Sequence, residues 1–288
     1  MGVASRWAGF VDVVSFSAEV RNLVDTLNQE IASAGRSAPR LPSHPAGFVK
    51  EITKRRLTMA EAYLRLVTFT GIDDYRERLD ALQTLIHQAW HSKTLLMPVN
   101  TARIQAALMK ECVKASGDKR RQLELMSDFA LASHGQQNVI HRLLREHDMI
   151  EVPEDGRPLS EMDLGWDDHV HDFLTEGRKT PCQLLLDAFI KGISRLTVAY
   201  YDLHDARVFE EALEAGRLLG IQVEIGIEFS VGKSTERLHF MFIPPGSTSA
   251  AELEEFLEAR KETLRPFFDG LDRNSDSRRR TISTLLEG

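Results

Sequence analysis

The sequence has few cysteines and no long apolar run. Its 288 residues hold two cysteines, Cys112 and Cys182, which stand far apart without a CxxC pair, so a disulfide framework is not expected. No stretch approaches the ~20 apolar residues of a membrane-spanning helix, and residues 1–10 lack the apolar core of a signal peptide. Arg6 stands where a myristoylation signal has Ser or Thr. These absences predict a cytoplasmic protein with no membrane partner.

Clusters of basic residues are also scarce. Asp and Glu together number 43 against 36 Lys and Arg, which gives a net charge of −7, whereas nucleic-acid phosphates are bound by clustered cations. The basic run at 278–280 lies close to Asp272 and Asp276 and is better explained as a solvated helix end than as a contact site. The sequence therefore predicts no nucleic-acid surface.

Helical periodicity runs through the first half of the sequence. Apolar residues recur at intervals of three and four from about Ser17 to Asp148, with a proline-containing loop at 39–45. Thr58 and Glu61 have the spacing of a capping box that would begin a helix. No glycine-rich phosphate loop interrupts this region. We expect an all-α domain over residues 1–148, with later helices over 73–92, 101–115, 119–131 and 136–147.

The second half of the sequence has a different period. Residues 149–162 hold Pro153, Gly156 and Pro158 and are typical of a linker between domains. After them, helices expected over 181–192, 206–219 and 250–271 alternate with strands expected over 196–201, 223–231 and 238–243. Such alternation favours parallel strands with helical crossovers. The expected fold is α/β: the helical domain, the linker, and an α/β domain over 163–288.

Candidate metal ligands lie at the ends of these expected strands. In Asp167-Asp168-His169-Val170-His171 the two histidines are two residues apart, so in an extended segment both rings project from one face. Asp202, His204, Glu228 and His239 also lie on or beside later strands. In parallel α/β folds, reactive groups collect where strands end. Each residue alone is better explained by an ordinary structural role, but the ordered set favours a metal site.

The motifs in this region resemble those of the PHP family, the polymerase and histidinol phosphatase domain of metal-dependent phosphoesterases. The family's first motif, D-x-H-x-H-S-x-x-S-D-G followed by T-P, matches Asp167, His169, His171, Glu176, Gly177, Thr180 and Pro181, with Glu176 in place of the second Asp. The G-x-E-x-S motif matches Gly226, Glu228 and Ser230, and a later strand His matches His239. The resemblance covers about residues 163–271 and none of the helical region.

The second motif of the family is only partly matched. T-D-H-D, which precedes a helix similar to the one at 211–221, aligns with Tyr201-Asp202-Leu203-His204. Leu203 stands where the family has a metal-binding His, so His204 would bind only if the loop shifted by one residue. The expected first strand, over 162–166, is poor in β-forming residues and depends mainly on the resemblance.

The resemblance implies a TIM-like (β/α) barrel and a hydrolase function. It implies that His169, His171 and Glu176 bind one ion, that Glu228 bridges two ions, and that His239 binds the second. Asp202 would be a ligand or an orienter of a histidine, and Glu228 and Asp202 would carry the catalytic roles. The cofactors would be two or three divalent ions, Mn²⁺, Zn²⁺ or Fe²⁺. The substrate would be a phosphorylated small molecule, hydrolysed by metal-activated water.

The family's barrel continues with further strands that supply another His and a late D-x-H pair, and this sequence ends at Gly288 without them. Four strands do not close a barrel of about eight. Three explanations stay open: the chain is a fragment, a partner or second copy covers the open sheet edge, or the domain is a non-catalytic PHP-like module with a helical interaction domain.

Overall fold

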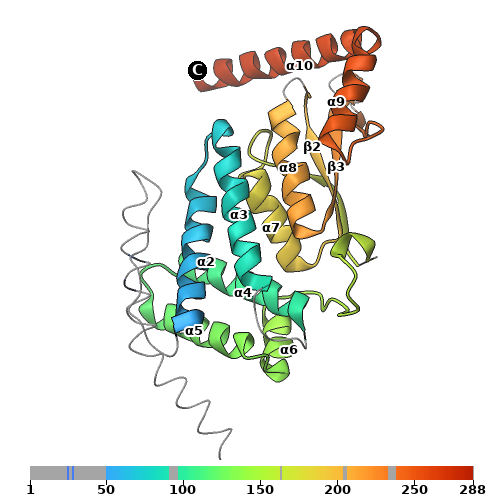
Figure 1. The fold of residues 1–288 in the computed structure, drawn as a ribbon. Coiled ribbons are helices and arrows are strands. Elements are labelled where there is room, and N and C mark those ends of the chain that lie inside the picture. Colours follow the sequence, from blue (N-terminus) through green and yellow to red (C-terminus); the bar gives the residue numbers. More distant parts are fainter. Residues whose placement is uncertain are drawn as a thin grey trace, which may run out of the picture.

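The computed structural model describes residues 25, 28, 50–90, 97–162, 164–203, 206–232 and 238–287. This part of the chain is mixed α/β, with nine α-helices, two short 3₁₀ helices and four strands (Figure 1). The expected helix near Ser17, the 39–45 loop and the candidate ligand His204 lie outside the described residues. No helix in the described ranges is long and apolar enough to cross a membrane.

A group of helices precedes the sheet. These are α2 (Lys50–Thr68), α3 (Tyr75–Trp90), α4 (Pro98–Lys114), α5 (Lys119–Ser133) and α6 (Gln137–Glu146). Pro98 occupies the first turn of α4, where a missing N–H costs nothing, and the Asp118 side chain caps α5 by accepting from Arg121 N at 3.0 Å. The helix start expected at Thr58 is wrong, because α2 runs through it: residues 50–57 hold no Gly or Pro that would stop a helix.

The four strands form one curled sheet in the order β1-β2-β3-β4. They are β1 (Trp166–Val170), β2 (Arg195–Tyr200), β3 (Gln222–Val231) and β4 (Leu238–Phe242). The first three strands are parallel, and α7 (Pro181–Lys191) and α8 (Ala206–Leu219) are their crossovers. Gly192 ends α7 with a left-handed φ of 86° that favours glycine.

The expectation of parallel strands is wrong for the last pair. β3 and β4 are antiparallel, with Ile227 opposite Phe242 and Val231 opposite Leu238. Only residues 232–237 separate the two strands, and a parallel crossover needs about a dozen residues or more. The short connection therefore imposes a hairpin.

Two other expected elements are displaced. The first strand begins at Trp166 rather than at residue 162, and a 3₁₀ turn, η2 (Leu159–Glu161), precedes it. Pairing with β2 decides where this strand lies, since Trp166 is opposite Arg195. The segment expected as one helix over 250–271 divides into α9 (Ala250–Ala259) and α10 (Lys261–Glu287). Pro266, which lacks a backbone donor, lies in α10 shortly after the break.

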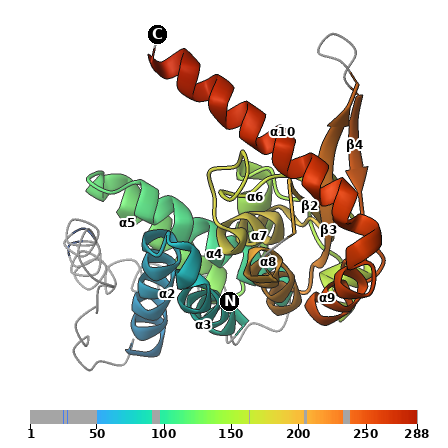
Figure 2. The same ribbon diagram turned by 90° about the horizontal axis from the view of Figure 1, so that it is seen from above.

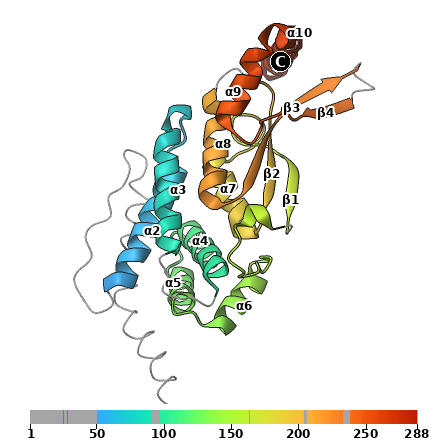
Figure 3. The ribbon, with the colours of Figure 1, turned by 45° about the vertical axis from the view of Figure 1, so that its right-hand side comes forward.

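The helices and the sheet are packed in layers (Figure 3). α7 and α8 lie against one face of the sheet. α3 packs on the side of α7 and α8 that faces away from the sheet, and α2 lies next to α3. One hydrophobic cluster includes Leu82 of α3, Phe209 of α8 and Ile225 of β3. The expected division into residues 1–148 and 163–288 stays a prediction, but the packing is continuous across it.

Buried cations help to join the helical region to the sheet region. Arg78 of α3 donates to both carboxylate oxygens of Glu211 in α8, at 2.8 Å from Nε, and both side chains are almost fully buried. Arg103 of α4 donates to the carbonyls of Phe189 and Ile190 at the end of α7. Burial lowers the pKa of Arg103 to about 10. Arg103 thereby holds the end of α7, where the Phe189 carbonyl also accepts from Gly192 N at 3.1 Å.

The two faces of the sheet are unequal. Leu196, Val198, Ile225 and Ile227 are buried beneath the helices, as alternation along a strand requires. In the views of Figures 2 and 3, none of the described helices covers the opposite face. We call this second face, which carries Thr197, Gly226 and Glu228, the open face.

Candidate metal site

A β-bulge in β1 directs His169, and His171 directly after the strand, to the open face. Asp167 is opposite Leu196 of β2, but Val170 is opposite Val198, so β1 has one more residue than β2 between these pairs. Without this bulge, His169 would lie opposite Val198 and face the helices. Because a shift of one residue moves every following side chain to the other face, the bulge places both histidines on the open face.

His169, His171 and Glu228 converge at this face. His169 Nε2 lies 3.1 Å from His171 Nε2 and 3.3 Å from Glu228 Oε2, and His171 Nε2 lies 3.1 Å from the same oxygen. Among the residues that the structure describes, these three form the group whose donor atoms all lie within 4.8 Å of one another. His169 lies on β1, His171 directly follows β1, and Glu228 lies on β3, with β2 between the two strands.

The spacing of these three atoms fits a shared ion. Ligand atoms at about 2.1 Å from one metal are separated by about 3.0–3.4 Å in tetrahedral or octahedral geometry. The three observed separations, 3.1, 3.1 and 3.3 Å, fall in this range. Two imidazoles and one carboxylate are a donor set that Zn²⁺, Mn²⁺ and Fe²⁺ accept. The residues present therefore fit a divalent transition metal.

His171 is oriented by its second ring nitrogen. Nδ1 lies 3.1 Å from the backbone oxygen of Ala199 and 2.9 Å from Thr175 Oγ1. A carbonyl only accepts, so Nδ1 carries the proton and Nε2 presents its lone pair to the group. Metal-binding histidines commonly have such an outer partner.

Glu228 links this group to His239. Its Oε1 lies 3.1 Å from His239 Nδ1, while its Oε2 faces the other two histidines. Partial burial opposes ionisation of Glu228, but hydrogen bonds from His239 and His169 outweigh it and lower the pKa of the carboxyl. The Glu228 carboxyl is therefore ionised at neutral pH, with one oxygen directed to His239 and the other to His169 and His171.

The other predicted site residues are placed differently. His239 is exposed and reaches the group only through Glu228. Glu176 is exposed in the turn after β1, and Asp202, half-buried, follows β2; neither belongs to the group within 4.8 Å. Leu203 is only 5% exposed.

Asp172, Thr175 and Tyr200 support the site and were not predicted as site residues from the sequence. Thr175 contacts His171, and Asp172, fully buried, accepts from Tyr200 Oη at 2.7 Å and from Leu174 N at 2.9 Å. Burial raises the pKa of Asp172 to about 6, although both hydrogen bonds act in the opposite direction. An Asp directly after a candidate ligand was the available signal for this buried support.

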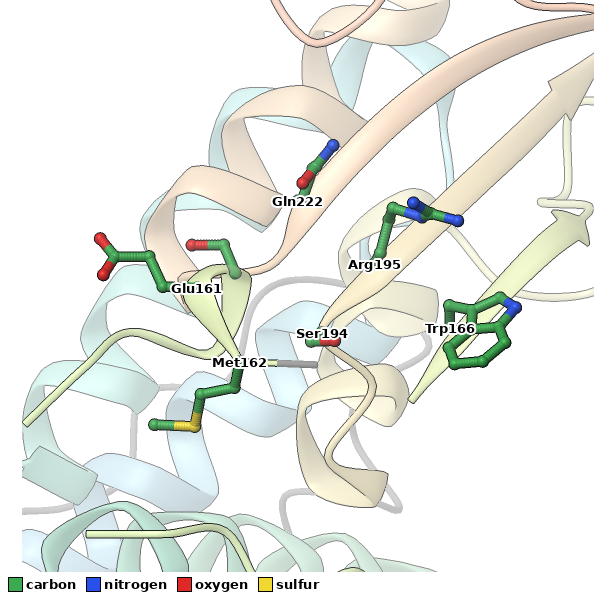
Figure 4. A pocket seen from close by; sticks show the side chains of 7 residues that line it. Glu161, Met162, Trp166, Ser194, Arg195 and Gln222 are labelled. Atoms are coloured by element: carbon green, nitrogen blue, oxygen red, sulfur yellow. The ribbon is translucent and has the colours of Figure 1, made fainter. Parts of the chain in front are cut away.

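A hollow of about 340 Å³ lies at the opposite end of the strands, where they begin (Figure 4). It is lined by Glu161, Met162, Trp166, Ser194, Arg195 and Gln222. Its polar groups are engaged within the protein: Ser194 Oγ donates to Gly165 O at 2.9 Å and Arg195 pairs with Asp168 at 3.3 Å. In Figure 4, Glu161 and Met162 project away from Trp166 and Arg195. The polar groups do not converge as they do around Glu228.

Comparison with known proteins gives no relative. No family model matches the chain, and searches of curated proteins and of solved structures likewise find no match.

Proposed function

We propose that this chain is a PHP-like, metal-dependent phosphoesterase that hydrolyses a phosphorylated small molecule. Its curled sheet would be the N-terminal part of a (β/α) barrel, with the open face as the barrel interior. The observation that carries this proposal is the set of separations of 3.1, 3.1 and 3.3 Å among the donor atoms of His169, His171 and Glu228. Alignment with the ordered motifs of the family supports the choice of reaction.

Each residue has a role that follows from its surroundings. His169 and His171 would supply imidazole nitrogens, and Glu228 would supply Oε2, to one ion. The remaining oxygen of Glu228 and His239 Nδ1, 3.1 Å apart, would hold a second ion. A divalent ion bound here lowers the pKa of a coordinated water and neutralises charge on the phosphate. Glu176 and Asp202 would complete or orient the ligand set.

Metal content is the first test of this function. After dialysis against Mn²⁺ or Zn²⁺ and removal of excess metal, we expect the wild-type protein to retain metal and to hydrolyse phosphomonoesters or diesters. Glu228→Gln should lose both properties because the amide carries no charge. Glu224→Gln is the matched control, since Glu224 lies on the same strand, accepts hydrogen bonds from Thr197 and Gln222, and is not part of the converging group. Wild-type protein that neither retains metal nor hydrolyses any ester would contradict the proposal.

A second candidate function is a metal-binding module without catalysis. Leu203, which aligns with a metal-binding His of the family, is buried beside a cavity of about 570 Å³ that Phe209 and Phe268 also line. A leucine supplies no ligand atom, so the site would lack one donor. If this alternative holds, the wild-type protein retains metal and Glu228→Gln does not, but the wild type hydrolyses esters no faster than Glu228→Gln.

A further inference from the structure

We infer that Thr175 is a positioning residue for His171, holding the imidazole in the tautomer and orientation that present Nε2 to a metal. This inference rests on the proposed function. Thr175 Oγ1 lies 2.9 Å from His171 Nδ1 and 3.2 Å from the backbone oxygen of Asp172. The family motif aligned above has Ser at the position of Thr175, so both carry a hydroxyl there, but the motif by itself does not show the contact with His171.

The directions of these hydrogen bonds follow from the chemistry of the groups. The carbonyl of Asp172 only accepts, so the Thr175 hydroxyl donates to it. The hydroxyl oxygen is then the acceptor for the proton on His171 Nδ1, which the carbonyl of Ala199 shares at 3.1 Å. Two acceptors on one side of the ring leave Nε2 as the nitrogen that faces His169 and Glu228.

The turn that carries Thr175 is held from several directions. The backbone oxygen of Asp172 accepts from Thr175 N at 3.1 Å and from Gly177 N at 2.8 Å. The Asp172 carboxylate is buried and accepts from Tyr200 of β2. A Cβ on Gly177 would lie 2.1 Å from the backbone oxygen of His171, so only glycine allows this close approach. Because the turn is stiff, the hydroxyl is pre-organised and costs little entropy to place.

His171 differs in this respect from the other two histidines of the site. The side chains of His169 and His239 are 50% and 59% exposed, whereas that of His171 is 18% exposed. The His239 Nδ1 faces Glu228 itself. His171 is therefore the ligand whose orientation is fixed before metal binds, and Thr175 is the side chain that fixes it.

The test compares Thr175→Val with Thr175→Ser. Valine has nearly the same shape but no hydroxyl, whereas serine keeps the hydroxyl. We expect Thr175→Val to weaken Zn²⁺ affinity, measured by competition with a chromophoric chelator, by about 10–100-fold, as loss of an outer partner does. Thr175→Ser should stay close to the wild type. Thr68→Val is the matched control, because Thr68 also donates to a backbone carbonyl, Leu64 O at 2.8 Å, but on α2.

A second measurement separates positioning from general stability and from the proposed function. NMR of the metal-free protein should show His171 as the Nδ1–H tautomer in the wild type and a mixture in Thr175→Val, with unchanged urea unfolding. Wild-type protein that binds no Zn²⁺ would refute the proposed function, while the tautomer measurement still decides the positioning role. Equal Zn²⁺ affinity, or an equal tautomer signal, in wild type and Thr175→Val would overturn the inference.

Discussion

The two faces of the sheet contrast in what their side chains already contact. On the face that α7 and α8 cover, which we call the covered face, Val198 and Ile225 are fully buried. Between α3 and α8, Arg78 donates hydrogen bonds to both carboxylate oxygens of Glu211, so the two charges are paired. On the open face, three donor atoms of His169, His171 and Glu228 point toward one another across 3.1–3.3 Å. They come from β1, from the residue directly after β1, and from β3.

Along each strand, residues that stabilise the fold alternate with residues that could bind an ion. Successive side chains of a strand point to opposite faces, so Ile227 and Glu228 are neighbours in the chain with different tasks. Buried apolar side chains stabilise the fold by about 1.5–3 kcal/mol each. The converging donor atoms would contribute free energy only when they bind an ion. Substitutions on one face should therefore leave the property of the other face nearly unchanged.

The largest effect on stability is expected for Arg78→Met. Removal of the guanidinium leaves the Glu211 carboxylate buried without its partner, which costs about 3–5 kcal/mol in the free energy of unfolding. Urea unfolding measures this loss. Arg217→Met is the control, because Arg217 and Glu214 form an exposed pair on α8 worth about 0–1 kcal/mol.

Metal affinity of the surviving folded Arg78→Met protein sharpens the comparison. Glu211 of α8 hydrogen-bonds with Arg78 and with Cys182 N and is not part of the converging group. The Arg78 guanidinium faces the Phe173 ring at 5.6 Å, so we expect at most a small change in Zn²⁺ affinity, transmitted through the turn after β1. A large fall in affinity without unfolding would mean that the two faces are coupled.

The second effect is expected for His169→Ala on the open face. Loss of a ligand atom should weaken Zn²⁺ binding by more than the about 10–100-fold that loss of an outer partner costs. The His169 side chain is half-exposed, so the free energy of unfolding of the metal-free protein should change by no more than about 0.5 kcal/mol. Chelator competition measures the Zn²⁺ affinity, and urea unfolding measures the free energy of unfolding. A fall in stability comparable to that of Arg78→Met would show that the open face also stabilises the fold.

The sequence predicts which residues could form this site better than how they are presented. The ordered motifs selected His169, His171 and Glu228, but together with Glu176, Asp202, His204 and His239, of which the described ones lie outside the converging group. The period of two shows that His169 and His171 share a face, but not which face. The bulge that decides this exists only in the pairing of β1 with β2, so the sequence of β1 by itself does not contain it.

Elements formed by distant parts of the chain were the hardest to predict. The antiparallel β4 was predictable from the short connection at 232–237, and the wrong expectation came from extending the helix–strand alternation too far. Arg78 and Glu211, separated by 133 positions, each look like an exposed charged residue on an amphipathic helix. Only their tertiary packing makes them a buried pair, and no local pattern signals it.

The smallest effect concerns Cys112, a thiol in the helical core. Burial raises the pKa of Cys112 to about 12, and the side chain is fully buried in α4. In a Cys182→Ser background, a disulfide reagent should therefore label folded protein at neutral pH only as fast as the protein opens. Val231→Cys in the same background is the control, because Val231 is exposed at the end of β3 and its thiol should react at once.

The pH dependence of stability has a definite sign at this thiol. The folded protein holds the Cys112 proton more tightly than the unfolded chain, whose thiol ionises near pH 9. Its contribution is therefore complete below about pH 9 and is lost as the pH rises toward 12. Cys112→Ala removes this contribution, so the stability difference between the two proteins should narrow across that window, measured by urea unfolding. Rapid labelling of folded Cys112 at neutral pH would show that the helices open without global unfolding. The helices and the covered face of the sheet would then not unfold as one cooperative unit.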